Sequence, residues 1–141
     1  MPFFYGFDAT YLLVIVGAVI CMAASAKLKA TYAKYAKIRA VSGITGAEAA
    51  EKILRYSGIY DVSIEHVSGD LTDHYDPSNK VLRLSDTTYG ARSVAAVSVA
   101  AHECGHAVQH AQNYVPLNLR KSMVPIVNIG STISWPMIIL G

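Results

Sequence analysis

An uncharged run of apolar residues from Ala9 to Ala26 places the strongest constraint on how this chain can fold. The run lies between Asp8 and Lys27, and as a helix it would cross about one membrane thickness. A cleaved signal peptide is the competing interpretation. Such a peptide carries positive charge ahead of its apolar stretch, whereas Asp8 is the only charged side chain in residues 1–8. We therefore expect a retained transmembrane helix.

Positive charge is concentrated directly after this run, at Lys27, Lys29, Lys34, Lys37 and Arg39. Because positively charged segments next to a membrane helix stay on the cytoplasmic side, this bias predicts a cytoplasmic domain and an outward N-terminus. A solvated face on a helix that continues past the membrane would explain the same charges. The net charge of +2 does not indicate nucleic acid, and the lipid bilayer with its anionic headgroups is the expected partner.

The length of 141 residues allows one small domain besides the membrane helices, and the 52% hydrophobic composition is high for a soluble domain of this size. No charged side chain follows Lys121, although two prolines and a glycine interrupt the last stretch. We interpret Met123 to Leu140 as a second transmembrane helix. The expected organisation is an anchor at 1–28, a domain at 29–121 and a second transmembrane helix at 122–141.

The middle of the chain predicts a mainly helical α+β domain. Gly43 should end the first helix, and the capping-box spacing of Thr45 and Glu48 starts another that ends at Gly58. Two short strands are expected at 61–67 and 80–85, with a turn at 76–79 between them. A long helix from about Ser93 to Gln112 should follow, capped by the Ser93 side chain.

The chemistry concentrates on that last helix, in His102-Glu103-Cys104-Gly105-His106. Residues four apart project from the same helix face, so His102 and His106 can bind one zinc ion. Glu103 then lies beside the metal, where it can act as general base toward a zinc-activated water. Glycine inside a helix costs about 1 kcal/mol relative to alanine, so we expect another chain segment to approach Gly105 closely. A coincidental pattern on a buried helix is the alternative.

A third metal ligand is not evident. Metzincin spacing would need histidine at 112, which is Gln112, and no Asp or Glu follows Glu103. His110 lies about 12 Å along the helix axis from His102, too far to share its ion. Upstream groups that could fold over the metal are Asp73, His74 and Asp76.

Several other reactive side chains favour structural roles. Cys104 fits a small buried residue better than a reactive thiolate, and a disulfide with Cys21 is not expected in a reducing cytoplasm. His66 alternates with apolar residues on a strand and should be a partly buried structural residue. Tyr89 and Tyr114 are near the motif helix, but nothing in the pattern assigns them a role.

The chain resembles the YugP-type membrane zinc metallopeptidases of bacteria, distant relatives of the HtpX-like gluzincins. The resemblance is carried by the N-terminal apolar helix and by four further segments: Ser42-Gly-Ile-Thr-Gly-Ala-Glu48, Gly69-Asp-Leu-Thr-Asp-His-Tyr-Asp-Pro77, Val81-Leu-Arg-Leu-Ser85 and Ala100-Ala-His-Glu-Cys-Gly-His-Ala-Val-Gln109. It implies a zincin-like fold, a Zn²⁺ cofactor, a peptide or membrane-protein substrate, and a place in the bacterial inner membrane as a multi-pass protein.

The resemblance also implies that the third zinc ligand is a glutamate between later hydrophobic helices. The sequence ends before such a residue, so we expect a C-terminally truncated fragment that binds zinc weakly. The resemblance also implies that residues 73–77 lie around the active site. The alternative is that these residues form only a polar turn between two strands.

Two other functions compete with this interpretation. An intramembrane protease would place the motif within a membrane helix, but its downstream aspartate is absent, and polar residues border the motif helix. A noncatalytic membrane scaffold could retain a vestigial or structural metal site. For the peptidase, we expect the strand at 80–85 to be a sheet edge that holds the substrate, with an interior strand as the alternative.

Overall fold

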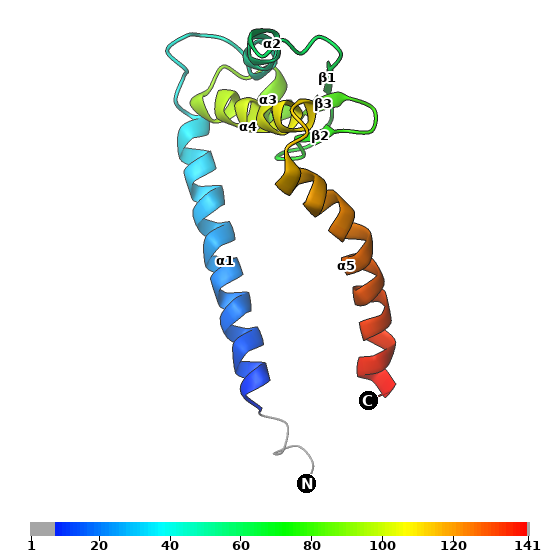
Figure 1. Cartoon of the computed structure of the whole chain (residues 1–141). Coiled ribbons are helices and arrows are strands. Elements are labelled where there is room, and N and C mark those ends of the chain that lie inside the picture. Colours follow the sequence, from blue (N-terminus) through cyan, green and yellow to red (C-terminus); the bar gives the residue numbers. More distant parts are fainter. Residues whose placement is uncertain (1–7, 141) are drawn as a thin grey trace.

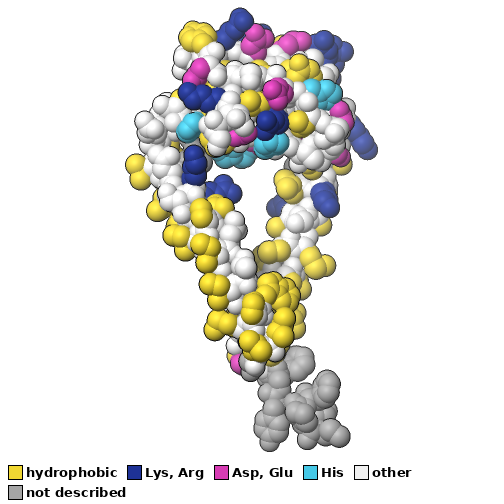
Figure 2. All heavy atoms as spheres, turned by 90° about the vertical axis from the view of Figure 1, so that its right-hand side faces the viewer, with side chains coloured by type: hydrophobic (Ala, Val, Ile, Leu, Met, Phe, Trp, Pro, Cys, Tyr) yellow, Lys and Arg dark blue, Asp and Glu magenta, His cyan; other side chains and the backbone are white. Residues whose placement is uncertain are grey.

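The computed structural model describes residues 8–140 and shows a small head with two long helices that extend from the same side of it (Figure 1). Helix α1 (Ala9–Ala36) leads into the head, and α5 (Val115–Leu140) leads away from it. Both helices are long and apolar enough to cross a membrane, by length and composition only. Most of their apolar side chains are exposed, whereas the head buries a hydrophobic cluster (Figure 2).

The head contains the remaining elements in the order α2 (Gly46–Tyr56), β1 (Ser63–His66), β2 (His74–Asp76), β3 (Val81–Leu84), α3 (Asp86–Tyr89) and α4 (Val94–Ala111). This confirms the predicted α+β class with a small β element and terminal apolar helices. The predicted caps are also present, because Thr45 Oγ1 accepts from the Glu48 amide at 3.1 Å and Ser93 Oγ from the Ala96 amide at 3.1 Å.

The first helix ends at Ala36, earlier than the predicted break at Gly43. The reason is that the chain beyond it pairs with the start of α4. The Ala40 amide donates to the Arg92 carbonyl, and the Val94 amide donates to the Ile38 carbonyl, both at 2.8 Å, around an isolated bridge between Arg39 and Ser93. Gly43 then turns the chain toward α2 with a φ of 66°.

The sheet has the strand order β1-β3-β2, with β1 parallel and β2 antiparallel to β3. The expectation that residues 80–85 form a sheet edge is therefore wrong, because β3 is central and paired on both sides. Strand β2 was not predicted, and lies where a polar linker was expected. The predicted turn does follow it, since Asp76 Oδ1 accepts from the Ser78 amide at 3.0 Å.

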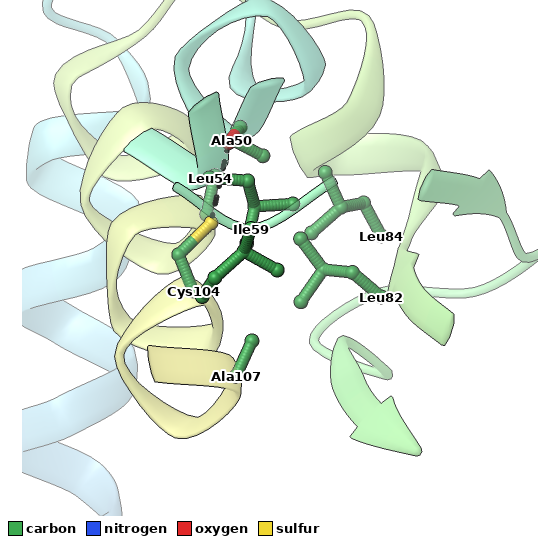
Figure 3. Close-up of a cluster of buried hydrophobic side chains, with 8 residues drawn as sticks. Ala50, Leu54, Ile59, Leu82, Leu84, Cys104 and Ala107 are labelled. Atoms are coloured by element: carbon green, nitrogen blue, oxygen red, sulfur yellow. Dashed lines mark hydrogen bonds between the residues drawn. The ribbon is translucent and has the colours of Figure 1, made fainter. Parts of the chain in front are cut away.

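The core lies where α2, α4 and β3 meet (Figure 3). Leu82 and Leu84 of β3 are fully buried, and small side chains of the two helices meet them. The buried cluster contains Ala50, Leu54, Ile59, Leu82, Leu84, Ala100, Cys104 and Ala107. Because one face of α4 is fixed against this core, the opposite face has a defined direction.

Candidate metal centre

His102 and His106 lie on the face of α4 that points away from the core. Their rings are 4.9 Å apart between centroids and nearly perpendicular, at 87°. His102 is exposed and His106 is half-buried. This arrangement suits two ligands of one ion, since imidazole is a preferred zinc donor and the remaining coordination positions stay open. Within residues 8–140, no third His, Cys, Asp or Glu completes a metal-binding group with them.

Glu103 lies beside this pair and is half-buried. Burial raises the pKa of its carboxyl group, and the neighbouring His106 and His102 oppose that shift. A carboxylate in such a setting can exchange a proton at a reacting water more readily than a fully solvated one. Its position next to the imidazoles, without a protein hydrogen-bond partner in the described residues, suits a base better than a structural anchor.

Glu103 and His106 open into a cavity of about 360 Å³. The other walls come from β2, the end of α4 and the start of α5: His74, Tyr75, Pro77, His110, Asn118, Arg120, Lys121 and Val124. Histidine side chains gather on the underside of the head, facing the space between the two long helices (Figure 2). A larger cavity of about 640 Å³ between α2 and β1 contains no residue of the motif, so volume alone does not mark the reactive site.

The three upstream candidates for a third ligand have different roles. Asp73 is held by the Ser85 amide at 2.7 Å and the Ser85 hydroxyl at 3.0 Å. Asp76 holds the turn after β2 and contacts Arg83 at 3.2 Å. Only His74 lines the cavity beside Glu103. The sequence therefore pointed to the segment that borders the cavity. Of its three candidate ligands, however, Asp73 and Asp76 form hydrogen bonds that stabilise the loop.

Both ring nitrogens of His74 are engaged. Nδ1 lies 2.9 Å from the Thr72 carbonyl oxygen, to which it must donate, so Nε2 is the nitrogen that accepts from Arg83 Nη1 at 3.3 Å. These contacts fix the orientation of the His74 ring, which forms a wall of the cavity. Arg83, which sequence analysis missed, therefore positions this wall from the central strand. Its alternation with the buried Leu82 and Leu84 was a usable signal, since it places Arg83 on the other sheet face.

Comparison with known proteins shows the family to which the chain belongs. The family model described as "Putative neutral zinc metallopeptidase" matches residues 10–141. The chain belongs to this family. It is 47% identical over 118 residues to "Putative membrane protease YugP" of Bacillus subtilis (strain 168), an alignment that covers 84% of this chain and 52% of that protein. The chain thus spans about half the length of this curated relative. No solved structure matches the chain.

Cys104 of this family member is a core residue, as predicted. It is fully buried, its thiol donates to the Ala50 carbonyl at 3.6 Å, and burial raises its pKa to about 12. A reactive thiolate is excluded by that environment. Cys21 is exposed and Cys104 is buried, and both are free.

Two expectations about neighbouring residues need correction. No chain segment approaches Gly105, because a Cβ built there meets nothing within 4 Å among the described residues. His66 was expected to be partly buried, whereas it is an exposed residue. It bonds Asp86 at 2.5 Å and stacks on Tyr89, with ring centroids 5.0 Å apart.

Tyr89 and Tyr114 do not line the cavity at Glu103. The tyrosine that does is Tyr75, which sequence analysis passed over. Its hydroxyl contacts His110, a residue considered only as a ligand and rejected on distance. The spacing of four between His106 and His110 was the available signal, because it places both on the same face of the helix.

Proposed function

We propose that this chain is a membrane-anchored zinc metallopeptidase, with His102 and His106 as zinc ligands and Glu103 as general base. The observation that carries the proposal is the half-buried Glu103 carboxylate, which lies beside two imidazoles and opens with His106 into one cavity. Zinc, when bound, would supply Lewis acidity toward the water and the substrate carbonyl.

The residues of the chain have separate tasks in this reaction. Glu103 takes a proton as the water oxygen forms its bond to the carbonyl carbon, and later gives that proton to the departing amine nitrogen as the C–N bond breaks. Burial favours the second task, because it makes the protonated carboxyl less costly. The described residues bring two imidazoles together, so we expect weak zinc binding by this chain.

The test combines zinc content with peptide cleavage. Replacing His102 or His106 with Ala should remove the zinc, whereas Glu103→Gln should keep it and lower cleavage by roughly 10²-fold or more. Equal zinc loss in Glu103→Gln would make that carboxylate a ligand. A closed site with four protein ligands and no exchangeable water would instead favour the noncatalytic scaffold.

Strand β2 is the proposed substrate-holding edge. Among the described residues it pairs with β3 on one side, and His74 and Tyr75 of this strand, with Pro77 directly after it, line the cavity beside Glu103. An extended peptide could add to this edge through main-chain hydrogen bonds, which depend little on side-chain identity. A scan of singly N-methylated test peptides should weaken binding at alternate positions. A uniform response along the peptide would place the substrate elsewhere.

The membrane arrangement is part of the proposal. α1 and α5 serve as transmembrane helices of a multi-pass inner-membrane protein, with residues 27–121 on the cytoplasmic side. Support comes from two exposed apolar helices and from the basic residues between them and the head (Figure 2). The exposed Ser57, changed to Cys in a Cys21→Ala background, should resist impermeant thiol reagents added to intact cells. Labelling from outside would reverse the orientation.

The motif helix itself is not one of the apolar helices. α4 packs through Ala96, Ala100 and Cys104 into the core of the head, which does not favour the intramembrane-protease alternative.

A further inference from the structure

A hydrogen bond joins β2 to the last turn of α4 at the far wall of the cavity. The Tyr75 hydroxyl lies 2.9 Å from Nδ1 of His110, and the two rings are 5.9 Å apart between centroids at an angle of 53°. Both residues are half-buried. The contact spans 35 positions in sequence and fixes the orientation of the His110 ring relative to the sheet.

The direction of this hydrogen bond determines where the His110 ring carries its proton. Burial raises the pKa of Tyr75, so its hydroxyl keeps its proton and can donate. A phenol donates more strongly than it accepts, because its oxygen lone pair is delocalised into the ring, whereas a bare imidazole nitrogen is a strong acceptor. Donation from Tyr75 to Nδ1 leaves the proton of the neutral ring on Nε2.

His110 differs from His74, which also lines the cavity, in the number of its ring nitrogens that have a hydrogen-bond partner. His74 is bonded at both nitrogens, to Thr72 and to Arg83. Nε2 of His110 makes no hydrogen bond to any residue in the described range 8–140, while the ring lines the same cavity as Glu103 and His106. It lies one helical turn beyond His106, about 6 Å along the axis. His110 is eight residues, about 12 Å along the axis, from His102, which is too far to share the ion that His102 and His106 bind. The position beside His106 suits contact with a substrate group next to that ion.

We propose that His110 is a catalytic residue of the peptidase, donating a hydrogen bond from Nε2 to the substrate carbonyl oxygen, and that Tyr75 is the positioning residue that sets its tautomer. This inference rests on the proposed function. As water adds to the carbonyl carbon and its proton passes to Glu103, negative charge develops on the carbonyl oxygen. His110 stabilises that charge without transferring its proton, and the C–N bond breaks when Glu103 protonates the amine.

The tautomer can be measured without any activity. Long-range ¹H–¹⁵N correlations of the histidine-labelled full chain in detergent micelles, at alkaline pH, should show His110 protonated at Nε2. Tyr75→Phe keeps the aromatic ring and removes the donor, so it should move His110 to a mixture of tautomers. A parent chain with His110 protonated at Nδ1 alone would overturn the inference, whatever the peptidase activity.

Kinetics supply the second readout, on the zinc-loaded chain with a test peptide. His110→Phe keeps an aromatic ring but has no N–H, and should lower kcat by roughly 10- to 1,000-fold with little change in KM or zinc content. His110→Gln retains a donor and should recover part of the loss. Tyr75→Phe should cost about 10-fold or less, because it acts only through His110.

The outcomes separate this inference from the proposed function. An active parent chain with an equally active His110→Phe variant would overturn the role of His110 and leave the peptidase intact. A zinc-loaded parent chain that cleaves no peptide would overturn the proposed function and the catalytic role of His110 together. The tautomer measurement would still stand as a description of the Tyr75 contact.

Discussion

The two faces of α4 differ in side-chain size, burial and number of protein partners. The inner face carries Ala96, Ala100, Cys104 and Ala107, which are almost completely buried against α2 and β3. The outer face carries His102, His106 and His110, which are exposed or half-buried. The inner face fixes the helix, and the outer face is left with few protein contacts. Substitutions should therefore affect stability on one face and chemistry on the other.

Removing core volume opposite the inner face should give the largest effect on stability. Leu82 is fully buried between its neighbours Ile64 and Tyr75 on the flanking strands. Leu82→Ala should lower the free energy of unfolding by about 2–5 kcal/mol. His102→Ala on the outer face should change it by less than about 0.5 kcal/mol. Hydrogen exchange of the α4 amides measures both, and similar exchange in the two variants would remove the distinction between the faces.

A second, smaller loss is expected where α2 starts. A Cβ added at Gly46 would lie 2.2 Å from the backbone oxygen of Thr88, a distance that requires the backbone to move. Gly46→Ala should cost about 1–3 kcal/mol, because overpacking displaces α2 from α3. The midpoint of urea unfolding, followed through the signals of the head, measures this loss. An unchanged midpoint would show that α2 and α3 are more loosely packed than described.

Changing Cys104, which lies within the His-Glu motif, tests how tightly the inner face of α4 is packed. Cys104→Ser replaces a thiol with a hydroxyl that reaches the Ala50 carbonyl less well, and should cost about 1–2 kcal/mol. In the Cys21→Ala background, the remaining thiol should react with a disulfide reagent only as fast as the head unfolds, since its pKa is about 12. Rapid reaction under native conditions would contradict the assignment of Cys104 to the core.

The smallest expected effect has the opposite sign. Gly105 lies in the middle of α4 with open space at its Cβ position, so Gly105→Ala should stabilise the helix by up to about 1 kcal/mol. Gly46→Ala is the matched control. A destabilising Gly105→Ala would show that another segment or a ligand occupies the outer face beside His102.

Sequence patterns predicted the elements in which local signals agree. α4 follows from its alanine content, the Ser93 cap and the absence of proline, and α2 from Thr45 and Gly58. The patterns failed where the secondary structure depends on pairing with a strand that is distant in sequence. β2 is only three residues long and polar, and it is a strand because β3 offers a partner. The Lys80 to Ser85 segment was correctly expected as a strand, but its central place depends on that same unpredicted neighbour.

The same limit applies to the candidate site. His102, Glu103 and His106 are visible in sequence because helical spacing alone brings them together. Arg83 meets His74 through the pairing of β2 with β3, and Tyr75 meets His110 where β2 lies against α4, so no local spacing predicts either contact. Asp73 and Asp76 look like ligands in sequence, yet their oxygens accept from backbone amides, that of Ser85 twelve positions away and that of Ser78 two positions away.

The backbone pairing between residues 38–40 and 92–94 has a mechanical consequence. It joins the end of α1 directly to the start of α4, so the nine residues between α1 and α2 do not act as a slack tether. If α1 is the proposed membrane anchor, a change in the tilt of that helix would also rotate α4. The head would then rotate together with α1. Bilayer thickness, which governs the tilt of a spanning helix, would then set the angle at which Glu103 meets the membrane surface.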